Sequence, residues 1–123
     1  MAEAGRYRNL HAWQKAMHLV TDVYQASNAW PKEEQYGLTS QLRRAAVSVP
    51  ANIAEGQGRT GTREFAHHLS IANGSLHETE TLILIALNLR LLEQTRCGDL
   101  LSQCSETGRL LSGLIRKLRA TDD

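Results

Sequence analysis

The sequence predicts an all-α protein, an antiparallel bundle of four helices in one domain. Apolar residues recur at alternating spacings of three and four along four segments, as in amphipathic helices that pack lengthwise. No segment shows the apolar-polar alternation of a half-buried strand, and 123 residues can bury a core without disulfide bonds or a metal. We expect flexible residues at 1–8, a bundle over 9–120 with helices at about 10–28, 33–58, 62–90 and 95–119, and a tail at 121–123.

The first helix is expected to begin after Asn9, whose side chain is suited to cap it. It is expected to end near Asn28, because Pro31 biases Trp30 away from helical geometry. The predicted core-facing seam of this helix consists of Leu10, Trp13, Met17, Val20, Tyr24 and Ser27.

The second helix contains an apolar stripe and a proline. Lys32, Glu33 and Glu34 are expected to open the helix, since carboxylates are favourable near its positive N-terminal end. Pro50 removes a backbone donor and clashes one turn back, so we expect the helix to be kinked there. The stripe that should face the core consists of Leu38, Leu42, Ala45, Val49 and Ile53.

A polar band runs beside this stripe, formed by Gln41, Arg44, Ser48, Asn52, Glu55 and Arg59. One interpretation makes Arg44, Asn52, Glu55 and Arg59 an exposed groove for a partner or for RNA. The other makes the band a hydrogen-bond network, with Glu55 paired to Arg59 and Asn52 bonded to Ser48 or to a neighbouring helix. The network is favoured because the band adjoins the core stripe, and such polar groups can also fix the register of an assembly.

The third helix follows the turn Arg59–Thr62, which should supply a threonine cap. Its predicted seam is Phe65, Leu69, Ala72, Leu76, Thr79, Ile83 and Ala86. From Leu82 onward the helix is apolar on nearly every side, and a small monomeric bundle would leave part of this surface in water. We therefore predict self-association through an interface formed by Leu82, Leu84, Ile85, Leu87 and Leu89.

The fourth helix is expected to begin near Thr95 and to bury Leu101, Cys104, Gly108, Leu111, Ile115 and Leu118. Cys97 and Cys104 lack the spacing of a metal or redox site and are interpreted as small core residues in a reducing compartment. The N-terminus has no apolar run typical of a signal peptide, and the longest apolar stretch, 82–92, is too short to span a bilayer. The sequence therefore favours a cytoplasmic protein.

Three stretches of the chain together resemble a known family. The run YGLTSQLRRAAVSVPANIAEGQGR at 36–59, preceded by LHAWQKAMHLV and followed by EFAHHLSIANGSLHETE, is similar to the 23S ribosomal RNA intervening-sequence proteins of bacteria. A related branch contains the accessory protein of diversity-generating retroelements. The resemblance covers residues 10–118 and implies an up-down four-helix bundle that assembles as a homopentamer, with no known catalysis.

Catalytic and metal sites find little support in the sequence. Glu64 and His67 form one E-x-x-H pair, but a di-iron bundle needs a second pair and two further glutamates, and His77 with Glu80 runs in reverse order. No serine has the context of a nucleophile elbow, and the glycines at 56–61 lack the setting of a phosphate-binding loop. We expect neither enzymatic activity nor a cofactor.

The charge balance limits any role with nucleic acid to local patches, because fourteen basic and thirteen acidic residues give a net charge of +1. Predicted nucleic-acid contacts are Arg43, Arg44, Arg59 and Arg63, and a second basic group consists of Arg109, Arg116, Lys117 and Arg119. The favoured function is a non-enzymatic oligomeric binding or scaffolding protein with RNA as ligand class, which the family resemblance suggests. The alternatives are an accessory subunit for another protein, such as a reverse transcriptase, and a metal-binding bundle using Glu64, His67 and His77.

Overall fold

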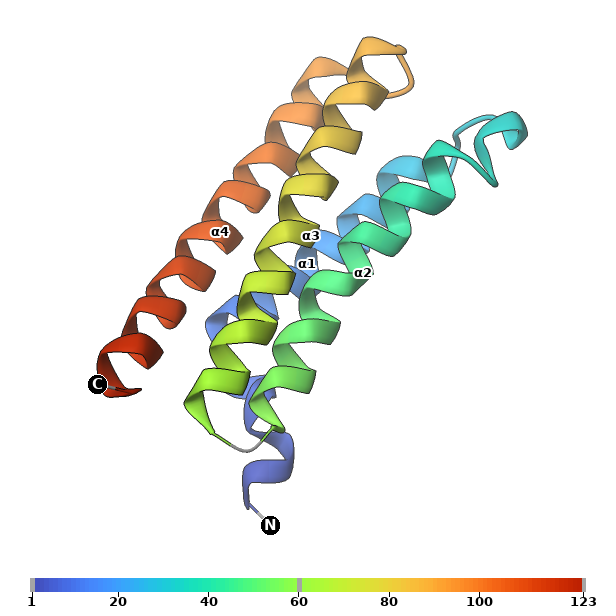
Figure 1. Cartoon of the computed structure of the whole chain (residues 1–123). Helices are drawn as coiled ribbons and strands as arrows, with labels where there is room; N and C mark the ends of the chain where they lie inside the picture. The colour runs from blue at the N-terminus through green and yellow to red at the C-terminus, as the bar shows by residue number, and fades with distance from the viewer. Residues whose placement is uncertain (1, 60, 123) are drawn as a thin grey trace.

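The computed structural model describes residues 2–59 and 61–122, which form four α-helices and no strand. The helices are α1 (His11–Ser27), α2 (Leu38–Gln57), α3 (Thr62–Asn88) and α4 (Gln94–Asp122). Two 3-10 segments, η1 (Ala2–Asn9) and η2 (Lys32–Glu34), precede α1 and α2. The four helices alternate in direction along the chain, which confirms the predicted up-down bundle (Figure 1).

The four helices are arranged around one core so that each helix packs against two neighbours. α2 packs on α1 and α3, and α4 packs on α3 and α1, with the most extensive contact between α2 and α3. The core lies between all four helices, where Leu19, Ile53, Leu69, Ile83 and Leu111 are each fully buried. None of the described helices is long and apolar enough to cross a membrane.

The apolar stripe predicted for α2 is confirmed, since all five of its residues are buried. Pro50 lies inside the helix and is buried as well, while the bend expected there stays a prediction. The predicted start of α2 is wrong. Lys32–Glu34 forms the separate segment η2, and α2 begins only at Leu38, because the backbone of Gly37 (φ −110°, ψ −110°) is not helical.

The seam predicted for the first helix is correct only in part, since Ser27 is buried and Leu10, Trp13 and Val20 are half-buried against the core. Met17 and Tyr24 are 41% and 42% exposed, whereas Ala12, Ala16, Leu19, Val23 and Ser27 form the buried face. Most of the buried residues lie one position before a predicted seam residue. Small alanine side chains on that face let a neighbouring helix pack closely against it. Asn9 does not cap the helix. Leu10 takes the N-cap position without a side-chain hydrogen bond, and residues expected to be flexible take the helical turns of η1.

The third and fourth helices bury most of the residues of their predicted seams, but their ends differ from the predicted bounds. In α3 the seam is buried except for Phe65, and in α4 Cys104 and Leu111 are buried while the other predicted residues are half-buried. The third helix stops at Asn88 because Arg90 adopts a left-handed conformation (φ 62°) and the Leu91 amide donates to the Ala86 carbonyl.

The turn into α3 and the end of α4 also differ from the predicted bounds. Gly61, with φ 94°, occupies the N-cap position of α3, and Thr60 of the predicted capping turn lies outside the described residues. The fourth helix runs past the expected end at 119 into the predicted tail, of which residue 123 is not described.

Candidate functional site

The middle of the polar band on α2 faces α3 and forms a hydrogen-bond network across the interface. Ser75 donates from Oγ to Ser48 Oγ at 2.9 Å, and Asn52 Nδ2 donates to Ser48 Oγ at 3.0 Å and to the Ser48 carbonyl at 2.9 Å. The Nδ1 atom of His68 lies 3.3 Å from Asn52 Oδ1. His68 is only 9% exposed, so the network ties a buried ring on α3 to α2. This confirms the network interpretation for Ser48 and Asn52.

The residues at the two ends of the polar band take no part in this network. Toward the C-terminal end, Arg59 donates from its guanidinium to Glu55 Oε2 at 2.8 Å, which is the pair expected from the sequence. Both side chains are about half exposed, so this pair contributes little to stability. Toward the N-terminal end, Gln41 and Arg44 are exposed.

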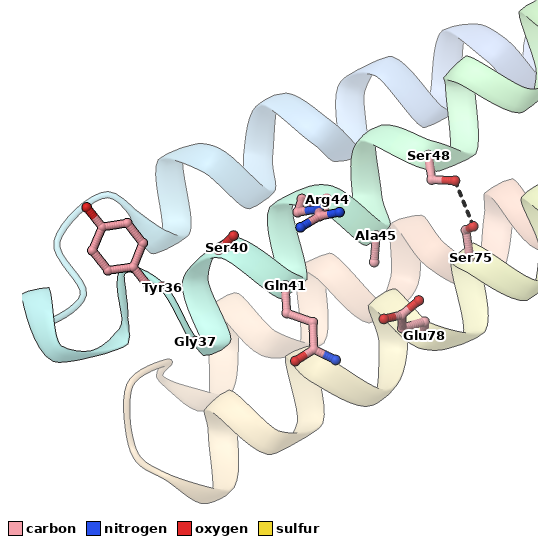
Figure 2. Close-up of a pocket in the computed structure, with 9 residues that line it drawn as sticks. All are labelled: Tyr36, Gly37, Ser40, Gln41, Arg44, Ala45, Ser48, Ser75 and Glu78. Atoms are coloured by element: carbon pink, nitrogen blue, oxygen red, sulfur yellow. Dashed lines mark hydrogen bonds between the residues drawn. The ribbon is translucent and has the colours of Figure 1, made fainter.

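Gln41 and Arg44 line a groove between α2 and α3 with a volume of about 530 Å³. Figure 2 shows Glu78 on α3 across the groove from Gln41, and Tyr36 at its outer end. The remaining lining residues are Gly37, Ser40, Ala45, Ser48 and Ser75. Within the part of the chain that the structure describes, no hydrogen bond or ion pair engages the side chains of Gln41, Arg44 or Glu78. These three polar groups are therefore available to a ligand or partner.

The four arginines predicted to contact nucleic acid do not form one patch. Arg43 and Arg44 lie near the start of α2, and Arg59 and Arg63 lie at the turn between α2 and α3, at the opposite end of the bundle. With a rise of about 1.5 Å per residue, the two pairs are about 20 Å apart. The prediction that they cluster is wrong because most of α2 lies between the two pairs.

Arg43 has a structural role instead. Its guanidinium lies over the Tyr24 ring, 4.4 Å from the centroid, its Nε donates to Ser27 Oγ at 2.9 Å, and a terminal nitrogen donates to the Tyr24 carbonyl at 3.3 Å. These contacts hold the start of α2 against the end of α1. The sequence did not reveal them, because the partners are 16 and 19 residues away.

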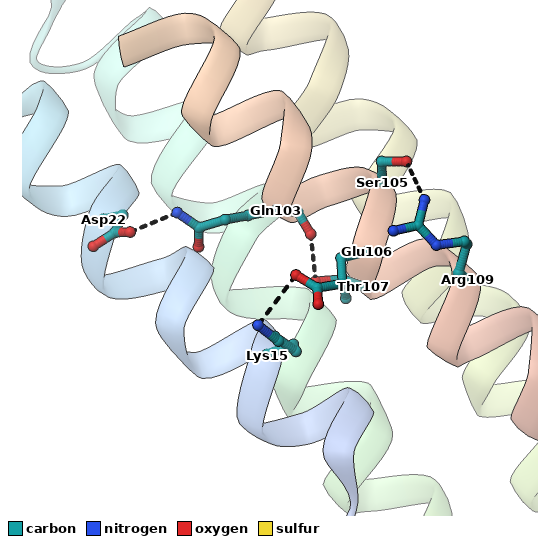
Figure 3. Close-up of polar contacts among 7 residues, drawn as sticks. All are labelled: Lys15, Asp22, Gln103, Ser105, Glu106, Thr107 and Arg109. Atoms are coloured by element: carbon teal, nitrogen blue, oxygen red, sulfur yellow. Dashed lines mark hydrogen bonds and ion pairs between the residues drawn. The ribbon is translucent and has the colours of Figure 1, made fainter. Parts of the chain in front are cut away.

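Polar contacts that the sequence did not predict join α1 to α4 (Figure 3). Gln103 Nε2 donates to Asp22 Oδ2 at 2.6 Å, and Lys15 Nζ lies 3.1 Å from Glu106 Oε1. Their partners lie more than eighty positions away in the chain, so only the closing of the bundle brings them together.

The predicted oligomer interface is divided between the core and the surface. Leu82 is 4% exposed and packs inside the bundle of its own chain, so its assignment to the interface is corrected. Leu87 is half-buried against the core. Leu84, Ile85 and Leu89 are 44%, 39% and 55% exposed. In the single chain, the C-terminal end of α3 and its C-cap residue therefore present three large apolar side chains to solvent.

The residues considered for a metal site do not assemble. Glu64, His67 and His77 are all exposed, and the Nδ1 atom of His77 lies 2.9 Å from the Asn73 carbonyl of its own helix. Among the side chains of the described residues, no group of three or more histidines, cysteines, aspartates or glutamates could hold a metal ion.

Cys97 and Cys104 are free thiols buried in the core, as the sequence predicted. Burial raises the pKa of both thiols, and with the nearby charge of Glu80 it raises the pKa of Cys104 to about 12. Neither sulfur is poised as a thiolate nucleophile near neutral pH.

Two comparisons place the fold among known proteins. A family model described as 23S rRNA-intervening sequence protein matches residues 8–113. The structure is similar to the crystal structure of a protein of unknown function from the S23 ribosomal protein family of Bacteroides thetaiotaomicron, with a TM-score of 0.76. The two chains are 19% identical, over 85% of this chain and 97% of the other, so this likeness concerns the fold alone. No curated protein matches the chain.

Proposed function

Because this chain belongs to the 23S rRNA-intervening sequence protein family, we propose that it is a non-enzymatic, homo-oligomeric binding protein of the cytoplasm that associates with RNA. The family description names ribosomal RNA, and the similar solved structure is assigned to a ribosomal protein family, which favours RNA as the ligand class. A pentamer is the subunit number that the family resemblance favours.

The observation that carries the oligomeric part is the exposure of Leu84, Ile85 and Leu89 on α3. At roughly 25 cal/mol per Å² of apolar surface, burying several such side chains against another copy stabilises an assembly by several kcal/mol. Leu89 is the C-cap residue of α3, and its amide donates to the carbonyl of Ile85, four positions earlier, so the two residues lie on the same side at the end of the helix. A flat contact with a second chain would cover both.

A role without catalysis is supported by the state of the nucleophilic and basic groups. The hydroxyl of Ser48 is occupied by two hydrogen bonds inside the network, and the thiols of Cys97 and Cys104 are buried. His68 faces Asn52. The exposed groove offers an amide, a guanidinium and a carboxylate, which recognise a partner more readily than they transfer a group.

Two measurements test the proposal. Sedimentation of the purified chain at micromolar concentration should give a single species several times the monomer mass, and a stable monomer would contradict the oligomeric part. Fluorescence anisotropy with a labelled single-stranded RNA should show binding at low ionic strength that weakens steeply as salt is added. Binding that is undetectable at low salt, or insensitive to salt, would contradict the RNA part.

A second candidate function, an accessory subunit for another protein, is favoured by the groove between α2 and α3. The groove carries charges of both signs in Arg44 and Glu78, and Tyr36 beside it is 90% exposed. Mixed charge with an exposed tyrosine suits a protein surface better than a polyphosphate. A protein recovered in stoichiometric amount with the wild type and with Arg109→Glu, but lost with Arg44→Glu, would support this role. Equal recovery with both variants would contradict it.

A further inference from the structure

Two cavities lie side by side at the end of the bundle where α2 meets α3 and α4 finishes. One, of about 290 Å³, lies between the first turns of α3 and the last turns of α4. The other, of about 400 Å³, lies between η1, the end of α2 and the same part of α4. Leu118 lines both cavities and therefore forms the ridge between them.

Both cavities are cationic. Arg63 and Arg119 line the first together with His67, and Arg6 and Lys117 line the second. Among the described residues, neither lining includes an aspartate or a glutamate. Within the same residues, no hydrogen bond or ion pair engages the side chains of Arg63, Lys117 or Arg119, and all three residues are exposed.

Two other cavities of the molecule contain a carboxylate as well as cations. The groove between α2 and α3 sets Glu78 opposite Arg44, and a cavity between α3 and α4 sets Glu80 beside Arg109 and Arg116. A carboxylate in the same cavity repels a phosphate, so the cations of these two cavities attract an anion less strongly. Among the described residues, the two cavities beside Leu118 are lined by cations and by no carboxylate.

We propose that these two cavities bind phosphate groups of one RNA strand, which crosses the end of the bundle over Leu118. This inference rests on the proposed association with RNA and assigns its contact surface. Arg63 and Arg119 approach the first cavity from different helices, so their planar guanidinium groups can each donate two hydrogen bonds to one phosphate. Lys117 supplies a point charge to the second cavity, and the apolar ridge lies between the two anions.

This surface differs from the one expected from the sequence. Arg43 is committed to Tyr24 and Ser27, and Arg59 is paired with Glu55. Of the four arginines originally predicted, only Arg63 belongs to the surface assigned here. Its partners Lys117 and Arg119 come from α4 and lie more than fifty positions further along the chain.

The test compares two variants with the same loss of charge. The site variant carries Arg63→Gln and Arg119→Gln, and the control carries Arg44→Gln and Arg90→Gln at the opposite end of the bundle. All four residues are exposed, and thermal unfolding followed by circular dichroism verifies that each variant is folded. Binding of a short labelled single-stranded RNA, and of DNA with the same sequence, is measured by anisotropy over a series of salt concentrations.

For two lost phosphate contacts we expect the slope of log K against log salt to fall by about 1.4, at about 0.7 per contact to a single strand. The site variant should lose at least about tenfold in affinity at low salt, whereas the control should retain the wild-type slope. Lys117→Gln alone should reduce the slope by about half as much.

The outcomes separate this inference from the proposed function. If the wild type binds RNA and both double variants weaken it equally, the assigned surface is wrong while the association with RNA stands. If the wild type does not bind RNA at low salt, the association itself is wrong. Tighter binding of DNA than of RNA would retain phosphate as the bound group and overturn RNA as the ligand.

Discussion

Gly56 on α2 lies directly against His68 on α3. A Cβ atom added at Gly56 would lie 2.5 Å from the Cβ of His68 and 3.2 Å from Cδ1 of Phe65. The glycine therefore lets the two helices approach beside the point where His68 meets Asn52. This contact explains a glycine inside a helix, where it costs about 1 kcal/mol relative to alanine.

The first prediction concerns this contact. Gly56→Ala should lower the free energy of unfolding by about 1–3 kcal/mol, because the new methyl group forces the helices apart. Gly74→Ala is the matched control, since a Cβ at that exposed helical position meets nothing within 4 Å. The control should stabilise the protein by about 0.5–1 kcal/mol. Urea unfolding measures both, and equal effects would show that the contact is not tight in solution.

The second prediction concerns the network between α2 and α3. Asn52→Ala should destabilise the protein by about 1–3 kcal/mol, because Ser48 and His68 each lose a hydrogen-bond partner in a half-buried setting. Gln41→Ala on the same band has no such bond to lose and should change stability by less than about 0.5 kcal/mol. Unfolding curves of equal midpoint for the two variants would rule out a stabilising network.

The third prediction separates two adjacent arginines. Arg43→Ala should destabilise the protein by about 1–2 kcal/mol, because it removes a cation–π contact and two hydrogen bonds to the end of α1. Arg44→Ala should leave the melting temperature nearly unchanged, since that side chain is exposed and makes no described polar contact. Differential scanning calorimetry decides between them, and a larger effect at Arg44 would contradict the assigned roles.

The fourth prediction locates the self-association surface. Ile85→Lys should shift the protein to smaller species in sedimentation velocity, because a charge in an apolar contact must be desolvated. Val47→Lys on α2 is the control, with 41% exposure against 39% for Ile85. It should leave the sedimentation coefficient unchanged. An assembly that survives Ile85→Lys but dissociates with Val47→Lys would move the interface to α2.

The fifth prediction concerns alkaline pH. The pKa of Cys104 is raised from 9.0 to about 12 in the folded protein, so between these values the folded state holds more protons than the unfolded state. Stability must then fall as the pH rises from about 9 to about 12. Unfolding measured across this range should show a steeper fall for the wild type than for Cys104→Ala. Parallel curves would mean that the thiol is not protected from solvent.

Several features of the fold could be predicted because they depend on residues close together in the chain. The stripe of α2 and the pair of Glu55 and Arg59 follow from helical spacing alone. The first helix shows the limit of that approach. Its largest apolar residues suggested one face, whereas the buried face includes Ala12 and Ala16, because the closeness of the neighbouring helix, and not side-chain size, decided which face was covered.

By itself, the sequence determined the class of fold, the helical segments, the family and the surplus of apolar surface on the third helix, since periodicity and composition act locally. Only the tertiary structure decided which charged groups meet. It separated Arg43 from Arg63 and brought Arg63 beside Arg119, which lies 56 positions away in the chain. The physical reason is that a helix rises about 1.5 Å per residue, so Arg43 and Arg63, on either side of most of α2, lie at opposite ends of the bundle, while the turns bring distant segments together.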